Sequence, residues 1–147
     1  MSNKLIYTSP DQVEKAFYEA FGRKNLKDMM GLWAEDEEIT CVHPTGSILV
    51  GYVQVQQGWQ QLFAKQTDNF SITVTLKQRV DGVMVASHQL IEEIRLNKED
   101  QKVEVGHVLA LNVFLRTPNG WRLIIHQAMG ISESYLNLDT NKQRILH

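Results

Sequence analysis

Two polar residues near the C-terminal end of the chain, Asn112 and His126, could bind a ligand or move a proton. A histidine ring gains and loses a proton near neutral pH, and an asparagine opposite it could fix which ring nitrogen carries the hydrogen. The alternative is a structural histidine whose hydrogen bond to Asn112 only satisfies a strand residue. The choice depends on whether both residues face a pocket.

The segment around these two residues is expected to form a β-hairpin. Residues 102–117 and 121–130 are strand-like runs rich in Val, Leu, Ile, Phe and Trp, and the Pro-Asn-Gly sequence at 118–120 is typical of a three-residue loop. If Thr117 pairs with Trp121, the two polar residues pair with each other farther along the hairpin. Because side chains alternate between the faces of a sheet, this pairing also sorts the hairpin into two faces.

One predicted face of the hairpin is mostly apolar, and the other holds the polar pair. The apolar face carries Leu109, Leu111, Val113, Leu115, Leu123, Ile125 and Met129. The second face carries Ala110, Asn112, Phe114, Ile124, His126 and Ala128, with Arg116 and Arg122 near the turn. A polar pair flanked by alanine, phenylalanine and isoleucine is typical of a pocket lining, so we expect the second face, Phe114 included, to contact a ligand.

Other ionisable side chains could reach the same pocket. His88 lies within a strand-like run, residues 83–96, and faces the pocket if the next turn keeps even positions aligned, whereas a four-residue turn would place it outside. Glu92 shares the parity of His88 and could orient it or act as a base, although a carboxylate near a strand end more often points to water. His43 precedes Pro44, which restricts it to an extended backbone and could aim its ring at the pocket mouth; stabilising the turn is an equal alternative.

Four aromatic residues, Tyr18, Trp33, Trp59 and Phe63, are candidates for the core or the pocket wall. Plain packing is the favoured interpretation for Trp33 and Phe63, whereas Trp59 is the best candidate for a platform under a ligand ring. Tyr18 could donate a hydrogen bond from the first helix, but it falls outside the apolar stripe of that helix and could equally face solvent.

A metal centre is disfavoured. The imidazoles of His43, His88 and His126 could together hold a metal that activates water, but no local spacing such as His-x-His supports this. We therefore expect neither a metal nor another cofactor. Cys41 lies among bulky neighbours and is expected to be a buried, inert thiol.

The composition favours one soluble domain without nucleic-acid or membrane partners. The chain has 147 residues, enough to bury roughly two-thirds of its unfolded surface, and its formal net charge is -2 without a basic run. We find no apolar core of signal-peptide length at the N-terminus and no run of about 18 apolar residues, so we expect a cytoplasmic protein. The single cysteine excludes an internal disulfide.

The hydrophobic pattern predicts helices first and then strands. Helices are expected over residues 10–24, 26–33 and 52–64, and strands over residues 39–42, 47–50, 70–80, 83–96, 102–117 and 121–130. Ser9 is expected to cap the first helix, with Gln12 completing a capping box. This order predicts an α+β domain in which N-terminal helices pack on one face of a curved antiparallel sheet. We expect one domain over residues 1–147, with a core at 9–131 and a surface arm or partly disordered tail at 132–147.

Three groups of residues carry a family resemblance. They are Leu32-Trp33 with Cys41-Val42-His43-Pro44, Gly51 and Trp59; Asn112-Val113-Phe114-Leu115-Arg116; and Gly120-Trp121-Arg122-Leu123 leading to His126-Gln127-Ala128. Together, over about residues 11–130, they resemble the nuclear transport factor 2-like superfamily and, within it, the SnoaL-like branch. This chain has Ile125 and Gln127 where many relatives have histidines, so roles of those histidines do not transfer.

The resemblance implies a cone-shaped sheet wrapped around the N-terminal helices, a pocket on its concave face, and a homodimer through its outer face. Members of the superfamily include ketosteroid isomerases, polyketide cyclases, limonene epoxide hydrolases, dehydratases and non-enzymatic transport and assembly domains, so the fold does not settle the function. A close copy of a ketosteroid isomerase is disfavoured, because no aspartate lies in the predicted pocket strands.

Two hypotheses remain. In the first, the chain binds a small molecule that is apolar or aromatic with polar groups, and isomerase, cyclase or hydrolase activity would use His126 or His88 as acid and base, with Asn112 orienting the ring. In the second, it is a non-enzymatic ligand-binding or assembly module. A carboxylate or histidine with a shifted pKa deep in the cavity would favour the first.

Overall fold

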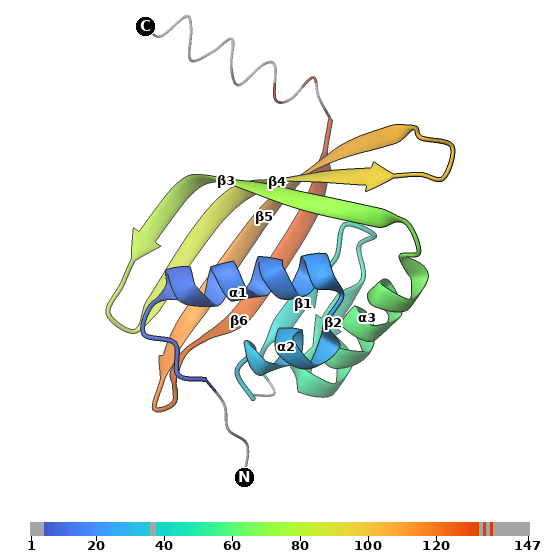
Figure 1. Ribbon diagram of the computed structural model, residues 1–147. Helices are drawn as coiled ribbons and strands as arrows, with labels where there is room; N and C mark the ends of the chain where they lie inside the picture. Colours follow the sequence, from blue (N-terminus) through green and yellow to red (C-terminus); the bar gives the residue numbers. More distant parts are fainter. Residues whose placement is uncertain (1–4, 36–37, 133, 135, 137–147) are drawn as a thin grey trace, which may run out of the picture.

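The computed structural model describes residues 5–35, 38–132, 134 and 136, which form three helices and six strands (Figure 1). The helices are α1 (Pro10–Arg23), α2 (Leu26–Gly31) and α3 (Gly51–Lys65). The strands are β1 (Thr40–Val42), β2 (Ile48–Val50), β3 (Asn69–Asp81), β4 (Val85–Asn97), β5 (Val103–Thr117) and β6 (Gly120–Ile131). The expected order of elements is confirmed, with small shifts at their ends. The prediction for the tail falls largely outside the described residues.

The first helix begins where its sequence predicts. The Ser9 side chain accepts a hydrogen bond from the Gln12 backbone N–H, and Pro10 occupies the first turn, where a backbone donor is not needed. The Gln12 side chain accepts from the backbone N–H of Thr8 rather than of Ser9, so the expected capping box closes one residue earlier. The inward side of α1 buries Val13, Phe17 and Ala20.

The strands form one sheet in the order β2-β1-β6-β5-β4-β3, which curves around α1 (Figure 1). Strands β3 to β6 form the expected antiparallel meander. Strand β1 departs from the expectation because it pairs with β6 in parallel, with Cys41 opposite His126. This pairing brings the end of β1, and His43 just after it, beside the second half of β6.

The β5–β6 hairpin has the expected register in its middle but not near its turn. Asn112 pairs with His126 as predicted, whereas Phe114 pairs with Leu123, because a β-bulge leaves Ile124 as an extra residue in β6. Our expectation that Leu123 lies on the outer face is therefore wrong. Its side chain points to the helices and is only 1% exposed.

The conformation of the turn explains why the register of the hairpin differs from the expectation near it. Thr117 pairs with Gly120 rather than with Trp121, and the Thr117 hydroxyl donates a 2.6 Å hydrogen bond to the Gly120 carbonyl. Gly120 has a φ of 93°, and a Cβ there would lie 2.7 Å from the Tyr7 carbonyl oxygen. Both the left-handed backbone and the close approach of the N-terminal segment thus require glycine.

The bulge also marks a change of neighbour along β6. On its turn side, the Leu123 backbone donates to the Leu32 carbonyl and accepts from the Ala34 N–H, in an isolated parallel bridge. Beyond the bulge, residues from Ile125 onward pair with β1.

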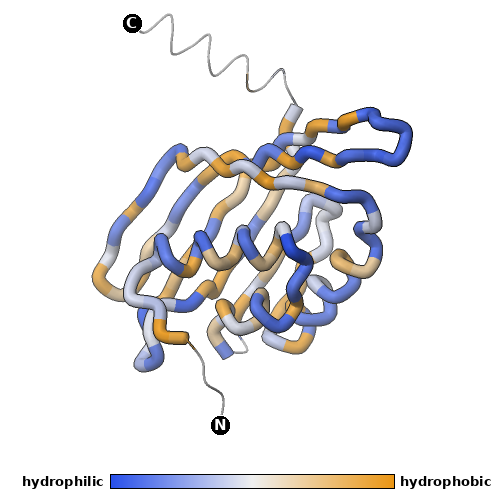
Figure 2. The backbone as a smooth tube through the Cα atoms, in the orientation of Figure 1, coloured by the Kyte–Doolittle hydropathy of each residue, from blue (hydrophilic) through white to orange (hydrophobic). Residues whose placement is uncertain are grey.

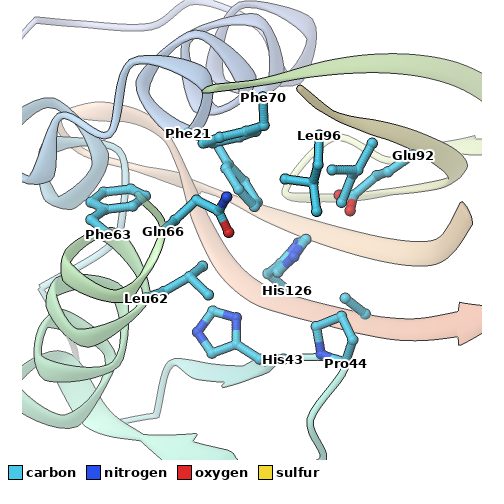
Figure 3. Close-up of a pocket in the computed structure, with 12 residues that line it drawn as sticks. Phe21, His43, Pro44, Leu62, Phe63, Gln66, Phe70, Glu92, Leu96 and His126 are labelled. Carbon is cyan, nitrogen blue, oxygen red and sulfur yellow. The ribbon is translucent and has the colours of Figure 1, made fainter. Parts of the chain in front are cut away.

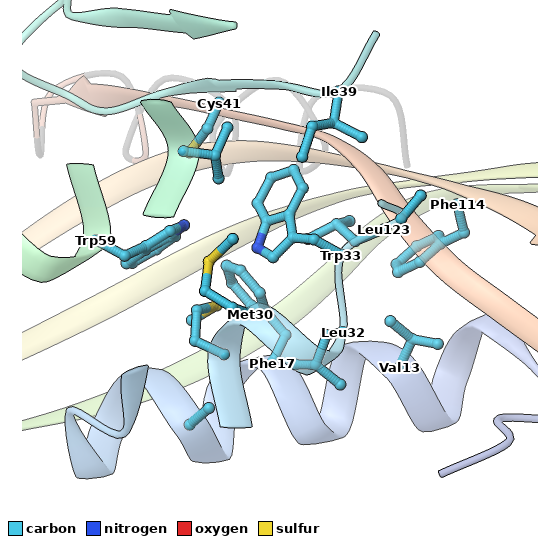
Figure 4. Close-up of a cluster of buried hydrophobic side chains, with 14 of the residues drawn as sticks. Val13, Phe17, Met30, Leu32, Trp33, Ile39, Cys41, Trp59, Phe114 and Leu123 are labelled. Carbon is cyan, nitrogen blue, oxygen red and sulfur yellow. The ribbon is translucent and has the colours of Figure 1, made fainter. Parts of the chain in front are cut away.

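The hydrophobic core lies between the three helices and the concave face of the sheet (Figure 4). Trp33, Trp59 and Phe114 are each 0% exposed, and burying side chains of this kind contributes about 1.5–3 kcal/mol each. Apolar and polar positions alternate along the strands and recur along the helices (Figure 2), as expected for elements that bury one side. None of the helices in the described part of the chain is long and apolar enough to cross a membrane.

Candidate functional site

A pocket of about 130 Å³ lies between the end of α3, the end of α1 and the concave face of the sheet (Figure 3). Its apolar lining consists of Phe21, Pro44, Leu62, Phe63, Phe70, Ile94, Leu96 and Ala128. Its polar lining consists of His43, Gln66, Glu92 and His126. Among the described residues, no lysine or arginine lines this pocket.

Glu92 is the ionisable group best placed for chemistry. It is on β4, its side chain faces inward, and it is only 2% exposed. Burial raises the pKa of Glu92 to about 7, although the hydrogen bond from Tyr18 acts in the opposite direction. The preference of strand-end carboxylates for water, which made Glu92 a weak candidate, does not hold here because the pocket wall and α1 cover it.

Tyr18 faces the site rather than solvent. Its hydroxyl donates a 2.7 Å hydrogen bond to Glu92 Oε2 and accepts one of 3.2 Å from Asn112 Nδ2. Burial and the neighbouring Glu92 charge raise the pKa of Tyr18, so the phenol keeps its proton and serves as a donor. Tyr18 does not itself line the pocket, but it holds Glu92 there.

Asn112 and His126 face each other on the concave side, as the sequence predicts. His126 Nδ1 lies 2.6 Å from Asn112 Oδ1, and the ring packs against Phe17 with centroids 4.8 Å apart. Burial, with a smaller contribution from His43, lowers the pKa of His126 to about 3, so the ring is neutral at physiological pH. His126 lines the pocket, whereas Asn112 lies behind it as the partner of the ring.

His88 is inward-facing but lies away from the pocket. It pairs with Asn112 across β4 and β5, and its Nδ1 lies 2.8 Å from Glu14 Oε2. Its Nε2 lies 3.7 Å from a carboxylate oxygen of Asp11. These contacts, together with a ring contact to Phe114 at 5.0 Å, describe a buried histidine bound to α1.

The aromatic candidates divide between the pocket and the core. Phe63 lines the pocket, whereas Trp59 is fully buried behind its wall and Phe114 is fully buried in the core beside His88. The Trp59 ring contacts the His43 ring at 4.7 Å and the Phe63 ring at 5.6 Å. Trp59 thus supports two lining residues and is not in a position to meet a ligand ring directly.

His43 lies in the pocket wall, and burial lowers its pKa. Its Nε2 lies 3.9 Å from Cys41 Sγ, and burial raises the pKa of that thiol, which disfavours a thiolate nucleophile. Within the described ranges of the chain, no three His, Cys, Asp or Glu side chains gather closely enough to hold a metal ion.

Glu14, which contacts both Asn112 and His88, was not predicted as a site residue from the sequence. Its Oε2 accepts from Asn112 Nδ2 at 3.2 Å and lies 2.8 Å from His88 Nδ1. Glu14 and Tyr18 are four residues apart and therefore lie on one side of α1, but this spacing alone does not indicate which strand they face. The aromatic Phe21 and Phe70 and the amide of Gln66, which complete the pocket, were not singled out as site residues either.

Solved structures with this architecture carry different descriptions. One, described as a calcium/calmodulin-dependent protein kinase type II association domain from Thiobacillus denitrificans, is 28% identical, with a TM-score of 0.80 over 87% of this chain and 99% of that chain. A second, described as a dehydratase from the NTF2-like family of Streptomyces avermitilis, is 24% identical, with a TM-score of 0.73 over 83% of this chain and 94% of that one. The second likeness shows the fold alone.

Comparisons of sequence point to one family. A curated relative, the F-box protein SKIP8 of Arabidopsis thaliana, is 25% identical over 118 residues, which are 79% of this chain. The chain spans about half the length of that relative, 47%. The family model described as the SnoaL-like domain matches residues 11–129. The chain therefore belongs to the SnoaL-like family.

Proposed function

We propose that the chain binds a small, neutral, mostly apolar molecule in this pocket and that Glu92 transfers a proton to or from it. The supporting observation is the carboxyl group of Glu92, 2% exposed in an apolar pocket wall, with its pKa raised to about 7. A carboxyl group of this pKa accepts a proton in its ionised form and returns it in its neutral form at physiological pH. Such a transfer is a step shared by isomerisation, dehydration and cyclisation.

This assignment changes the roles expected of the histidines. With a pKa lowered to about 3, His126 is not an acid at neutral pH, and His88 lies outside the pocket lining. In the proposed site Glu92 moves the proton, Tyr18 holds its carboxylate, and His126 binds and orients the ligand.

The size of the pocket suits a single ring. Its volume is about 130 Å³, and an engineered cavity of about 150 Å³ in another protein holds benzene. Phe21, Phe63 and Phe70 supply aromatic surface for such a ring. No lysine or arginine is among the described lining residues, and the nearby ammonium of Lys24 already donates to the Gln66 carbonyl, so a neutral ligand is favoured over an anion.

A second candidate is a non-enzymatic assembly module, favoured by the 28% identity to the association domain. The outer face of β5 and β6 carries the half-buried Leu109, Leu111, Val113 and Ile125, and Met129 is 57% exposed. A largely apolar sheet face, interrupted here by the exposed Gln127 opposite Leu111, is typical of a subunit interface, so we propose a two-fold homodimer through it under either function.

Deuterium exchange separates the two candidates. The probe is 4-hydroxycyclohexanone in heavy water, with loss of the protons beside its carbonyl followed by NMR. We expect the protein to accelerate exchange, with a rate that rises as pH passes about 7 because the ionised carboxylate is the base. Glu92→Gln should remove the acceleration, and Glu93→Gln, on the opposite face of β4, should retain it. Exchange at the buffer rate with the unaltered protein would reject proton transfer and leave the assembly module.

A further inference from the structure

We propose that Nε2 of His126 is a fixed hydrogen-bond acceptor, so that the pocket selects neutral ring compounds bearing a hydroxyl or N–H donor over those bearing only a carbonyl. This inference rests on the proposed binding function and adds the class of ligand. It also makes Asn112 a positioning residue that acts through the imidazole.

The orientation of the Asn112 amide follows from its partners on α1. Its Nδ2 lies 3.2 Å from Glu14 Oε2 and 3.2 Å from the Tyr18 hydroxyl. A carboxylate oxygen accepts and does not donate, and the Tyr18 hydrogen is already directed to Glu92. Turning the amide over would place two acceptors in contact, so Nδ2 faces the helix and Oδ1 faces the sheet.

The tautomer of His126 follows from that orientation. Because Oδ1 can only accept, the 2.6 Å contact requires the hydrogen on His126 Nδ1. The ring is 1% exposed and packed between Phe17 and Trp59, an environment that favours the neutral form with one hydrogen. Nε2 therefore carries a lone pair, and it is the nitrogen that remains for a molecule in the pocket.

Glu92, another residue of the lining, also favours a donor on the ligand. Glu92, in its ionised form, is a second acceptor in the same wall. A carbonyl oxygen placed at His126 would meet a lone pair, and its own hydration would be lost without replacement. A hydroxyl group would instead satisfy Nε2 by donating to it.

The tautomer can be measured without any ligand, by long-range proton–nitrogen NMR correlations of the His126 ring in the unaltered protein. We expect a protonated Nδ1 and an unprotonated Nε2 at neutral pH. A hydrogen on Nε2 would overturn the inference while leaving the proposed binding function standing.

Ligand selectivity is measured with cyclohexanol and cyclohexanone, rings of nearly equal size, by NMR titration of the protein. We expect cyclohexanol to bind about tenfold more tightly, the effect of one buried acceptor left unsatisfied. Asn112→Leu should reduce this preference because either ring nitrogen can then carry the hydrogen, whereas Asn97→Leu, at an exposed strand end, should preserve it. Equal binding of the two rings would overturn the inference alone, and binding of neither would reject the proposed binding function with it.

Discussion

The Tyr18 hydroxyl donates a 2.7 Å hydrogen bond to Glu92 across 74 residues of sequence, and this contact links α1 to the pocket side of β4. The bond favours the ionised carboxylate, whereas burial favours the neutral acid, and burial is the larger effect. The result is a carboxyl group that the fold holds near its point of half-ionisation at physiological pH.

Glu92→Gln should change how stability depends on pH. The folded pKa of about 7 lies above the ordinary value of 4.5, so the folded protein loses stability as pH rises from the ordinary value through 7. Glutamine removes this dependence. The free energy of unfolding of the variant, relative to that of the unaltered protein, should therefore rise by about 3 kcal/mol from acidic to mildly basic pH. Urea unfolding at both pH values measures the difference. A difference that does not vary with pH would contradict the raised pKa.

Tyr18→Phe should raise the pKa of Glu92 further, because the hydroxyl that stabilises the ionised form is lost. The loss of one hydrogen bond to a charged group corresponds to about one pKa unit. A titration followed by carbon NMR of the Glu92 carboxyl group measures this pKa directly. Tyr52→Phe is the matched control, because the Tyr52 hydroxyl donates to the Met30 carbonyl and not to Glu92. The pKa of Glu92 should not change in that variant.

Leu111→Glu should dissociate the proposed homodimer, because it places a charge in the middle of the apolar outer face of the sheet. Sedimentation at micromolar concentration should show a dimer for the unaltered protein and a monomer for this variant. Val83→Glu, at a turn position that is 76% exposed, should remain a dimer. A monomeric unaltered protein would reject the interface.

Cys41 should resist thiol reagents in the folded protein. Its side chain is 0% exposed, and burial raises the pKa of the thiol, so neither access nor the thiolate form is available. Labelling with a chromogenic disulfide should therefore follow the fraction unfolded as urea is added. Rapid labelling without urea would show that β1 opens readily.

The residues of β4 and β5 that face inward were predictable, because side chains alternate strictly between the two faces of the sheet over several residues. His88, Asn112 and His126 all face the concave side, and their mutual pairing follows because the turn between β4 and β5, residues 98–102, has an odd number of residues and so keeps even positions aligned. The position of Leu123 was not predictable by this rule, since a bulge interrupts the alternation. The bulge accompanies a turn set by Gly120 and its contact with the N-terminal segment, which no local pattern indicates.

The acid–base part of the candidate site depended on tertiary packing and was therefore harder to predict. Nothing near Glu92 in sequence indicates that α1 covers it, and its partner Tyr18 lies off the main apolar stripe of that helix. Glu14 is equally remote from the strands that it contacts. A polar residue beside an apolar helical stripe is ordinary at a surface and becomes informative only when the opposing strand is known.

The bulge at Ile124 has a consequence for local unfolding. It interrupts the ladder where the neighbour of β6 changes from the Leu32–Ala34 segment to β1, so the two halves of the strand are held by separate sets of backbone hydrogen bonds. Breaking the bonds of one half does not require breaking those of the other. Local opening of the half that carries His126 would therefore leave the bonds of Leu123 in place, and we expect faster amide exchange at Gln127, whose side chain is exposed, than at the buried Leu123.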